Sequence, residues 1–325
     1  MNTWIIVLLL IVGIALIIKG GDFFVDAAVW IAEISGVPSF IIGATIVSMA
    51  TTLPELIVSM MAAGQGSVDM AAGNAIGSVT ANVGLIMGIS LFCLPSVIKR
   101  DQIAFKGILM MAAITCLWIF SAENGNALSI GASVIMLCLF ALFIIENVVR
   151  TKKNADTEEA KEEQKGRQKP TAKVIASNLL KFILGVIGIV WGADLLVDNG
   201  CALAAIFGVP EGIIGVTIVA IGTSLPELVT TITAIVKKQS SLSVGNIIGA
   251  NIIDLTVIMP LCAVVSGKAL PVSDQMISLD MPACMLVCLI AMVPALIWEK
   301  FRRWQGVTLL IVYVGYVVLM CINYM

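Results

Sequence analysis

Long apolar segments dominate the chain and recur at short intervals. Apolar segments of about 18–25 residues have the length of membrane-spanning helices. About ten are present, approximately over residues 3–19, 37–63, 71–97, 103–121, 127–149, 172–195, 209–236, 242–266, 276–297 and 304–324. The pattern predicts an all-α membrane protein with about ten transmembrane helices.

One segment breaks this apolar pattern. Residues 150–171 read RTKKNADTEEAKEEQKGRQKPT, with charges of both signs and little apolar content. Such a composition is typical of a solvated loop, and the segment is too short to hold a folded regulatory domain. We therefore divide the chain into residues 1–149, a charged loop over 150–171, and residues 172–325.

The two flanking parts repeat each other at a constant offset of 172 residues. Polar residues stay in register in three pairs of segments: GGDFFVD at 20–26 with GADLLVD at 192–198, GATIVSMATTLPEL at 43–56 with GVTIVAIGTSLPEL at 215–228, and GNAIG at 73–77 with GNIIG at 245–249. Each part holds about five predicted helices, an odd number, so the second must enter the membrane from the opposite side. Two inverted five-helix repeats of this kind place a transporter's binding site near the middle of the bilayer. The alternative is an old duplication without functional symmetry, and the intramembrane carboxylates of the best-matched segments count against it.

The composition supports a membrane protein, and the basic residues predict its orientation. Of the 325 residues, 59% are hydrophobic and 12% are charged, and the mean hydropathy is +1.06, which excludes a soluble globular domain. Basic residues gather at alternate helix ends, namely at Lys19, Lys99, Arg100, 150–171, Lys237, Lys238, Lys300, Arg302 and Arg303. The positive-inside rule places these ends in the cytoplasm. We therefore expect a plasma-membrane protein with a cytoplasmic central loop and both termini outside, and only Lys268 opposes this orientation.

Composition also disfavours several kinds of site and partner. The chain has no histidine, which removes imidazole as a zinc ligand or proton relay. Its eight cysteines form no CxxC pair and lie mostly in apolar segments, where we expect small buried residues. The net charge of -2 gives no reason to expect a nucleic-acid partner. The first segment lacks a basic start and is interpreted as a retained helix rather than a signal peptide.

The second predicted helix contains a single carboxylate, Glu55, directly after Pro54. A proline within a helix removes a backbone hydrogen bond, so carbonyl groups near residue 50 become available beside the hydroxyls of Thr51 and Thr52. Unpaired backbone groups are tolerated within a membrane only where protein buries them or where they line a polar cavity. Carboxylate, hydroxyl and carbonyl oxygens together suit a hard cation such as Ca2+ or Na+.

The second half supplies the same set of groups in Thr223, Ser224, Pro226 and Glu227. Two such kinks that meet from opposite sides would bring two buried carboxylates together, and these would repel each other without a cation. Bound Ca2+ would cancel both charges and two or three Na+ ions could do the same, so the pair predicts competition and hence exchange. The alternative is a protonated glutamic acid that only joins helices, which is harder to accept for two symmetry-related residues.

Polar side chains also follow one face of the next helix in each half, at spacings of four residues. They are Asn74, Ser78 and Asn82 in the first half, matched by Asn246, Ala250 and Asp254 in the second. The two leading asparagines could serve only to join helices. Asp254 is a third intramembrane carboxylate and is harder to explain in that way.

These segments resemble the two alpha repeats of the calcium/cation antiporter superfamily, in its sodium/calcium exchanger branch of the prokaryotic type. The pairs TTLPEL with GNAIGS and GTSLPEL with GNIIGAN carry the resemblance, most specifically over 43–82 and 215–254. The resemblance implies a secondary antiporter, not an enzyme, that exchanges Ca2+ for Na+ by alternating access at a midplane site. We expect it to need no cofactor and to function as a monomer in the lipid bilayer.

The resemblance also implies the ligands of the transported ions. Glu55 and Glu227 would be shared by Ca2+ and Na+, with Thr51 and Thr223 beside them. The remaining ligands would be Thr52, Ser78 and the carbonyl of Ser48 around one Na+ site, Ser224 and the carbonyl of Ala220 around its mirror image, and Asn82 and Asp254 along the centre.

A few positions depart from the family pattern. Thr52 stands where serine is usual, Val79 where asparagine is frequent, and Ala250 where a serine usually serves the outward Na+ site. Asp254 matches potassium-dependent relatives, so K+ co-transport stays open. The proton-coupled branch usually carries a glutamate shortly after its GN pair, and none is present here, which disfavours H+ coupling.

Other function classes are less consistent with the sequence. A proton-coupled antiporter is disfavoured by the missing histidine and by the missing glutamate after GN. A channel is disfavoured because an inverted repeat with paired carboxylates predicts a closed central site with slow turnover. A membrane-embedded hydrolase would need a zinc set, a serine with a base, or an aspartate pair. No HExxH is present and no lysine is expected near a serine in mid-membrane, and the surroundings of the two glutamates disfavour an aspartate pair.

Overall fold

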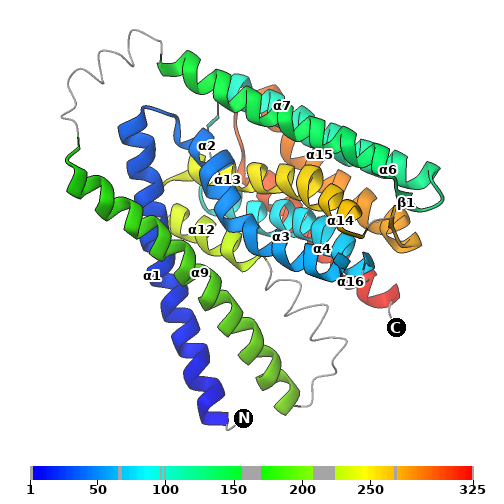
Figure 1. Cartoon of the computed structure of the whole chain (residues 1–325), viewed down its shortest axis with the longest axis horizontal. Helices are drawn as coiled ribbons and strands as arrows, with labels where there is room; N and C mark the ends of the chain where they lie inside the picture. Colours follow the sequence, from blue (N-terminus) through cyan, green and yellow to red (C-terminus); the bar gives the residue numbers. More distant parts are fainter. Residues whose placement is uncertain are drawn as a thin grey trace.

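The computed structural model describes residues 3–64, 68–95, 97–98, 100–155, 170–207, 224–266 and 269–323. Helices account for nearly all of them (Figure 1). The exceptions with regular structure are β1 (Ala127–Leu128) and β2 (Leu270–Pro271), which pair antiparallel with Ala127 opposite Pro271. The prediction of an all-α membrane protein is confirmed, since this pairing only joins two connecting segments.

The first half contains five membrane spans, two of which change helix type along their length. Its elements are α1 (Thr3–Ser35), α2 (Ser39–Ile42), the π-helical η1 (Gly43–Val47), α3 (Ser48–Gly64), α4 (Val68–Ala81), the π-helical η2 (Asn82–Met87), α5 (Gly88–Cys93), α6 (Arg100–Glu123) and α7 (Ile130–Ala155). The segments α2, η1 and α3 continue into one another as a single span, as do α4, η2 and α5.

The second half repeats this arrangement. Its elements are α9 (Ala172–Ile206), α12 (Leu225–Val236), α13 (Ser240–Ile253), the π-helical η4 (Asp254–Ile258), α14 (Met259–Ser266), the π-helical η5 (Met276–Asp280), α15 (Met281–Trp298) and α16 (Arg303–Asn323). In the described part of the chain, nine helical stretches are long and apolar enough to cross a membrane, and α12 is a shorter apolar helix. The expected start of its span, residues 209–223, lies outside the described residues.

The first helix of each half is longer than the sequence predicted. Helices were expected over 3–19 and 172–195, but α1 continues to Ser35 and α9 to Ile206. The GGDFFVD and GADLLVD segments contain no proline, so their polar residues do not end the helix. In α1, Asp22 and Asp26 lie one turn apart and both bind Lys237, with Nζ–Oδ1 distances of 3.4 and 2.7 Å.

Glycines let α1 and α9 pack closely against each other at one flank of the bundle (Figure 1). A side chain at Gly20 would come within 2.8 Å of the backbone nitrogen of Ile189, and one at Gly192 would come within 2.8 Å of the carbonyl oxygen of Gly13. Small residues of this kind are the usual means by which membrane helices approach each other.

Burial separates this flanking pair from the centre of the protein. In the most apolar stretch of the span over Ser240–Ser266, 83% of the residues are buried inside the protein. In the corresponding stretch of the span over Ala172–Gly200, only 17% are buried. The span over Ala71–Cys93 is also largely buried, at 72%. The two helices that follow the predicted kinks, one from each half, therefore form the centre around which the polar residues gather.

Candidate ion-binding site

The backbone around the site departs from regular α-helix at matching places in the two halves. Asn82 opens the π-helical η2 and Asp254 opens the π-helical η4, and the two residues are 172 positions apart. Single π-helical turns are frequently found at functional sites. The sequence predicts Pro54 as the source of the irregularity. Pro54 lies within α3, and the departure from α-helix is instead at η1, directly before Ser48.

Glu55 lies where both halves of the protein meet. Its Oε1 accepts hydrogen bonds from Ser78 Oγ of α4 at 2.8 Å and from Ser224 Oγ, directly before α12, at 3.1 Å. The two serine oxygens are themselves 3.4 Å apart. None of these three side chains is more than 3% exposed. Residues that the sequence placed in separate repeats are thus within hydrogen-bonding distance in the interior.

Two threonines of α3 line the same region. The carbonyl oxygen of Ser48 accepts hydrogen bonds from Thr52 Oγ1 at 2.7 Å and from Thr51 Oγ1 at 3.3 Å. Thr51 Oγ1 also donates to Asn246 Oδ1 of α13 at 3.3 Å. Both threonine hydroxyls lie beside the carboxylate of Glu227. The amide of Asn246 then donates to Thr230 Oγ1 at 3.0 Å, so α3, α13 and α12 are joined by one chain of polar contacts.

The site contains more buried oxygen atoms than its own donors satisfy. Within the described residues, no hydrogen bond reaches Glu55 Oε2 or either carboxylate oxygen of Glu227 and Asp254, and the side-chain amides of Asn82 and Asn251 are also unpaired. Leaving a buried polar group without a partner costs about 1–3 kcal/mol, and more for a charged one. The charge of Glu55 also repels those of Asp254 and Glu227. Unpaired oxygens and excess negative charge in one place are the properties that a hard cation would neutralise.

The carboxylates do not converge into a dedicated cage. In the described parts of the chain, no three acidic or cysteine side chains lie close enough together to hold one metal ion. A cation at this place would therefore be bound by one or two carboxylates together with hydroxyl, amide and carbonyl oxygens. Such mixed sets are compatible with weak, reversible binding.

Comparison with known proteins agrees with this arrangement. A family model described as sodium/calcium exchanger protein matches residues 5–149 and 177–322. The chain belongs to the sodium/calcium exchanger family. An uncharacterized membrane protein of Methanocaldococcus jannaschii, MJ0091, is 32% identical over 94% of both chains. The sodium/calcium exchanger MaX1 of Methanosarcina acetivorans is 29% identical over 96% of this chain and 97% of its own.

A solved structure resembles this sodium/calcium exchanger family member over nearly its whole length. It is that of the sodium-calcium exchanger NCX_Mj, soaked with Na+ and Sr2+, with a TM-score of 0.79 and 28% sequence identity. The match covers 97% of this chain and 99% of the other. The helical fold with two repeats is therefore shared over 97% of this chain.

The remaining predicted ligands of this exchanger-family site are placed as follows. Asn82 and Asp254 are fully buried at the starts of η2 and η4. Thr223 and Ala220 lie outside the described residues. Ala250 is fully buried on α13 and offers no side-chain oxygen, while its neighbour Asn251 is buried with both amide atoms unpaired.

The side of the site that faces α2 is closed by direct backbone contact. The carbonyl oxygens of Leu242 and Phe40 occupy the space that side chains at Gly43 and Gly245 would need, and a side chain at Gly249 would come within 2.5 Å of the carbonyl oxygen of Ala44. The glycines of GNIIG thus let α13 lie directly against α2 and η1. The repeat in the sequence indicates this segment but not the helix that it contacts, because contacts between distant segments leave no local signal.

Proposed function

We propose that this protein is a secondary active antiporter that exchanges Ca2+ for Na+ by alternating access at the buried site around Glu55 and Glu227. The observation that carries the proposal is the meeting of both halves at Glu55, with unpaired carboxylate oxygens nearby, in a chain that belongs to the sodium/calcium exchanger family. A buried site without enough donors favours cations, and an inverted repeat provides two related ways of opening it.

In this proposal each ion is held by oxygens from both halves. Glu55 and Glu227 serve Ca2+ and Na+ in turn, with Thr51 and Thr223 beside them. The other ligands are Thr52, Ser78 and the Ser48 carbonyl at one Na+ site, Ser224 and the Ala220 carbonyl at its counterpart, and Asn82 and Asp254 between them. Hydroxyls that now bond within the protein would turn toward the bound ion.

Two related functions compete with this one. Asp254 adds a third carboxylate, which could hold K+ or H+ in addition to Na+. Potassium-dependent exchange and H+-coupled exchange therefore stay as alternatives, distinguished by which monovalent gradient drives Ca2+.

The deciding experiment is Ca2+ flux through the purified protein in liposomes, with Na+, K+ and H+ gradients imposed one at a time. We expect an outward Na+ gradient to drive Ca2+ uptake and the other gradients to add little. Ca2+ uptake that follows only the pH gradient would refute Na+ exchange, and uptake that needs K+ beside Na+ would establish the K+-dependent alternative. Liposomes with the double variant Glu55→Gln/Glu227→Gln serve as the control.

The orientation is part of the same proposal. Residues 1–149 and 172–325 form the two repeats, the loop over 150–171 faces the cytoplasm, and both termini lie outside. A single copy carries out transport. A cysteine placed at Ala155, with the native cysteines replaced, should be protected from an impermeant thiol reagent in intact cells and should react in inverted vesicles. Reaction in intact cells would invert the orientation.

A further inference from the structure

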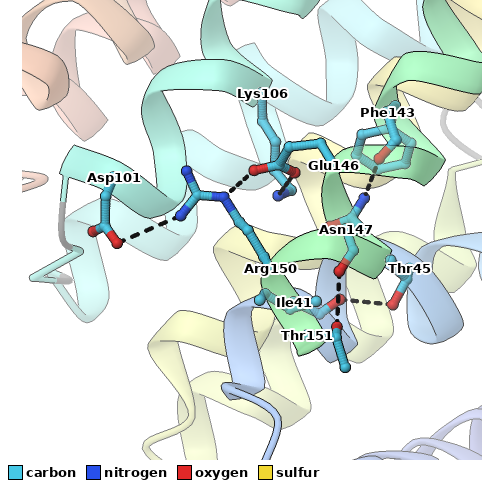
Figure 2. Close-up of polar contacts among 9 residues, drawn as sticks. All are labelled: Ile41, Thr45, Asp101, Lys106, Phe143, Glu146, Asn147, Arg150 and Thr151. Atoms are coloured by element: carbon cyan, nitrogen blue, oxygen red, sulfur yellow. Dashed lines mark hydrogen bonds and ion pairs between the residues drawn. The ribbon is translucent and has the colours of Figure 1, made fainter. Parts of the chain in front are cut away.

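A charged cluster lies outside the ion site, between α6 and α7, and extends from the buried Lys106 to the exposed Asp101 (Figure 2). Lys106 is fully buried, and its Nζ lies 2.7 Å from Glu146 Oε2. Glu146 also accepts a hydrogen bond from Arg150, whose Nη1 lies 3.4 Å from Asp101 Oδ2. Intramembrane charges are costly and are usually kept for a function, yet the ion site does not use this pair.

The ammonium of Lys106 also contacts two aromatic rings. It lies 5.6 Å from the ring centre of Phe40 on α2 and 5.9 Å from that of Phe143 on α7. Distances below about 6 Å give a favourable cation–π interaction, which strengthens when the cation is shielded from water. The Lys106–Glu146 pair therefore reaches α2 as well as joining α6 to α7.

Phe40 is in turn connected to the ion site on its other side. Its carbonyl oxygen fills the space beside Gly245, one residue before the Asn246 that binds Thr51. Along its own chain, α2 passes through η1 directly into Ser48. Phe40 thus lies between the buried ammonium and the closed contact of α2 and η1 with α13.

In the described part of the second repeat, no ion pair lies at the corresponding place between α15 and α16, where Tyr316 instead donates a hydrogen bond to Asp280 at 3.0 Å. The positions 172 residues after Lys106 and Glu146 are Ser278 and Val318, which carry no charge. The ion pair is therefore a feature of the first repeat, and in the proposed orientation it marks a difference between the two sides of the membrane.

We propose that the Lys106–Glu146 pair is a positioning device that holds Phe40, and with it α2 and η1, against α13, and so keeps one side of the ion site closed. In the predicted orientation this is the cytoplasmic side. Opening it requires Phe40 to move away from Lys106. The inference rests on the proposed alternating-access function for its role, although the contact itself can be tested without transport.

The test measures how readily the closed contact opens. Leu242 is 2% exposed and its carbonyl lies against Gly43, so a cysteine introduced by Leu242→Cys reports opening between α13 and η1. The purified protein in detergent is treated with a positively charged methanethiosulfonate reagent, and modification of that one thiol is followed by mass spectrometry. The labelling rate of each variant is compared with that of the parent, and every protein in the comparison carries Leu242→Cys.

The main variant is Lys106→Gln/Glu146→Gln, which keeps a hydrogen-bonding link between α6 and α7 but removes both charges. We expect about tenfold faster labelling, equal to a shift of about 1.4 kcal/mol in the opening equilibrium. Phe40→Leu, which keeps the ion pair and removes the ring, should raise the rate about threefold. Glu299→Gln is the matched control, because it breaks an exposed ion pair with Arg100 that does not contact α2, and it should leave the rate unchanged.

Unchanged labelling in both test variants, with melting temperatures near that of the parent, would refute the positioning role. If the double variant does not fold, Phe40→Leu decides alone. Faster labelling in a protein that shows no Na+-driven Ca2+ flux would leave this inference standing and refute only the proposed function. Normal Na+-driven Ca2+ flux together with unchanged labelling would support the proposed function and refute the positioning role of the Lys106–Glu146 pair.

Discussion

The two halves of the candidate ion site are built on the same scaffold but carry different side chains. Glu55 has a hydroxyl from each repeat bound to Oε1, whereas neither oxygen of Glu227 has a hydrogen-bond partner in the described part of the chain. Ser78 is matched by Ala250 and Asn82 by Asp254. The backbones of the two halves nevertheless match at this place, since the π-helical turns η2 and η4 begin at equivalent positions.

This difference shows that inverted repeats can preserve geometry while the chemistry of the two sides diverges. The first half gains a hydroxyl at Ser78, and the second half gains a negative charge at Asp254 and an unpaired amide at Asn251. A Na+ ion on the first side would be bound by neutral oxygens next to one glutamate, while an ion on the second side would meet more charge and fewer hydroxyls. Exchanging ligands between the halves tests whether this asymmetry matters.

We expect the largest effect on Ca2+ exchange from substitutions of the two matched glutamates, Glu55 and Glu227. Glu55→Gln and Glu227→Gln each keep the side-chain shape but remove one of two charges that would neutralise Ca2+. Truncating one partner of a buried charge interaction typically costs about 3–5 kcal/mol, so each variant should lose Ca2+ exchange about a hundredfold or more in the liposome assay.

Glu123→Gln, an exposed carboxylate at the end of α6, is the matched control and should exchange normally. If either glutamine variant at the site kept a rate near that of the wild type, the two halves would not share one Ca2+ site. A difference between the two variants would also be informative, because Glu55 has serine hydroxyls from both halves as donors, whereas Glu227 lies beside the hydroxyls of Thr51 and Thr52 of the first half.

Ser78→Ala should have the next largest effect, since it makes the first half resemble the second at this position. It removes the 2.8 Å hydrogen bond to Glu55 and one predicted Na+ ligand. Hydrogen bonds to charged groups are worth about 1.5–3 kcal/mol, so the Na+ concentration for half-maximal exchange should rise about tenfold or more. Ser90→Ala, which removes a buried hydroxyl bound to Ser243 away from the glutamates, serves as the control. An unchanged Na+ dependence would remove Ser78 from the ligands.

Sequence alone predicted the spans and proposed the residues of the candidate site, because apolar segments and the repeat both leave signals in the sequence. Apolar length predicts a span, and the 172-residue offset aligns Glu55 with Glu227 before any contact is known. The lengths of α1 and α9 were wrong because polar residues in a helix without proline do not end it, particularly where packing between glycines supports the helix.

Other features had no signal in the sequence. The π-helical turns at Asn82 and Asp254 depend on how neighbouring helices pack, which residue types do not specify. The Lys106–Glu146 pair joins residues forty positions apart, and a lysine near the end of a predicted span is ordinarily interpreted as an interfacial charge. Neither could be inferred without the arrangement of α6, α7 and α2.

Asp254→Asn gives the second half the residue found in the first and tests whether the extra charge sets ion coupling. We expect Ca2+ exchange to stay within about tenfold of the wild type, which is about 1.4 kcal/mol, since both glutamates that would neutralise Ca2+ are unchanged. A carboxylate can take up a proton or bind a monovalent cation, whereas a carboxamide cannot take up a proton and carries no charge. In the variant, the exchange rate should therefore fall less steeply as the pH is lowered, or any dependence of the rate on K+ should disappear. The measurement is flux over a series of pH values, with and without K+.

The reverse change, Asn82→Asp, is the matched control for this prediction. It adds a second central carboxylate and should strengthen the dependence on pH or K+ if such coupling operates through the centre of the site. Identical pH and K+ profiles in all three proteins would exclude Asp254 from coupling.

The smallest expected effect is that of Ala250→Ser, which restores to the second half the hydroxyl that Ser78 provides in the first. Ala250 is fully buried, so the added hydroxyl must find a partner among the oxygens and ions of the site. Because Na+ needs oxygens to replace its lost water, the external Na+ concentration for half-maximal exchange should fall, by less than the roughly tenfold value of one charged hydrogen bond. The competing possibility is that Asn251, buried beside it with an unpaired amide, already fills this place. Na+-dependent Ca2+ flux over a range of external Na+ separates the two for Ala250→Ser and Asn251→Ala. If the serine leaves the Na+ curve unchanged while Asn251→Ala weakens it, the second half uses an amide where the first uses a hydroxyl, and the two Na+ sites differ in ligand rather than in strength.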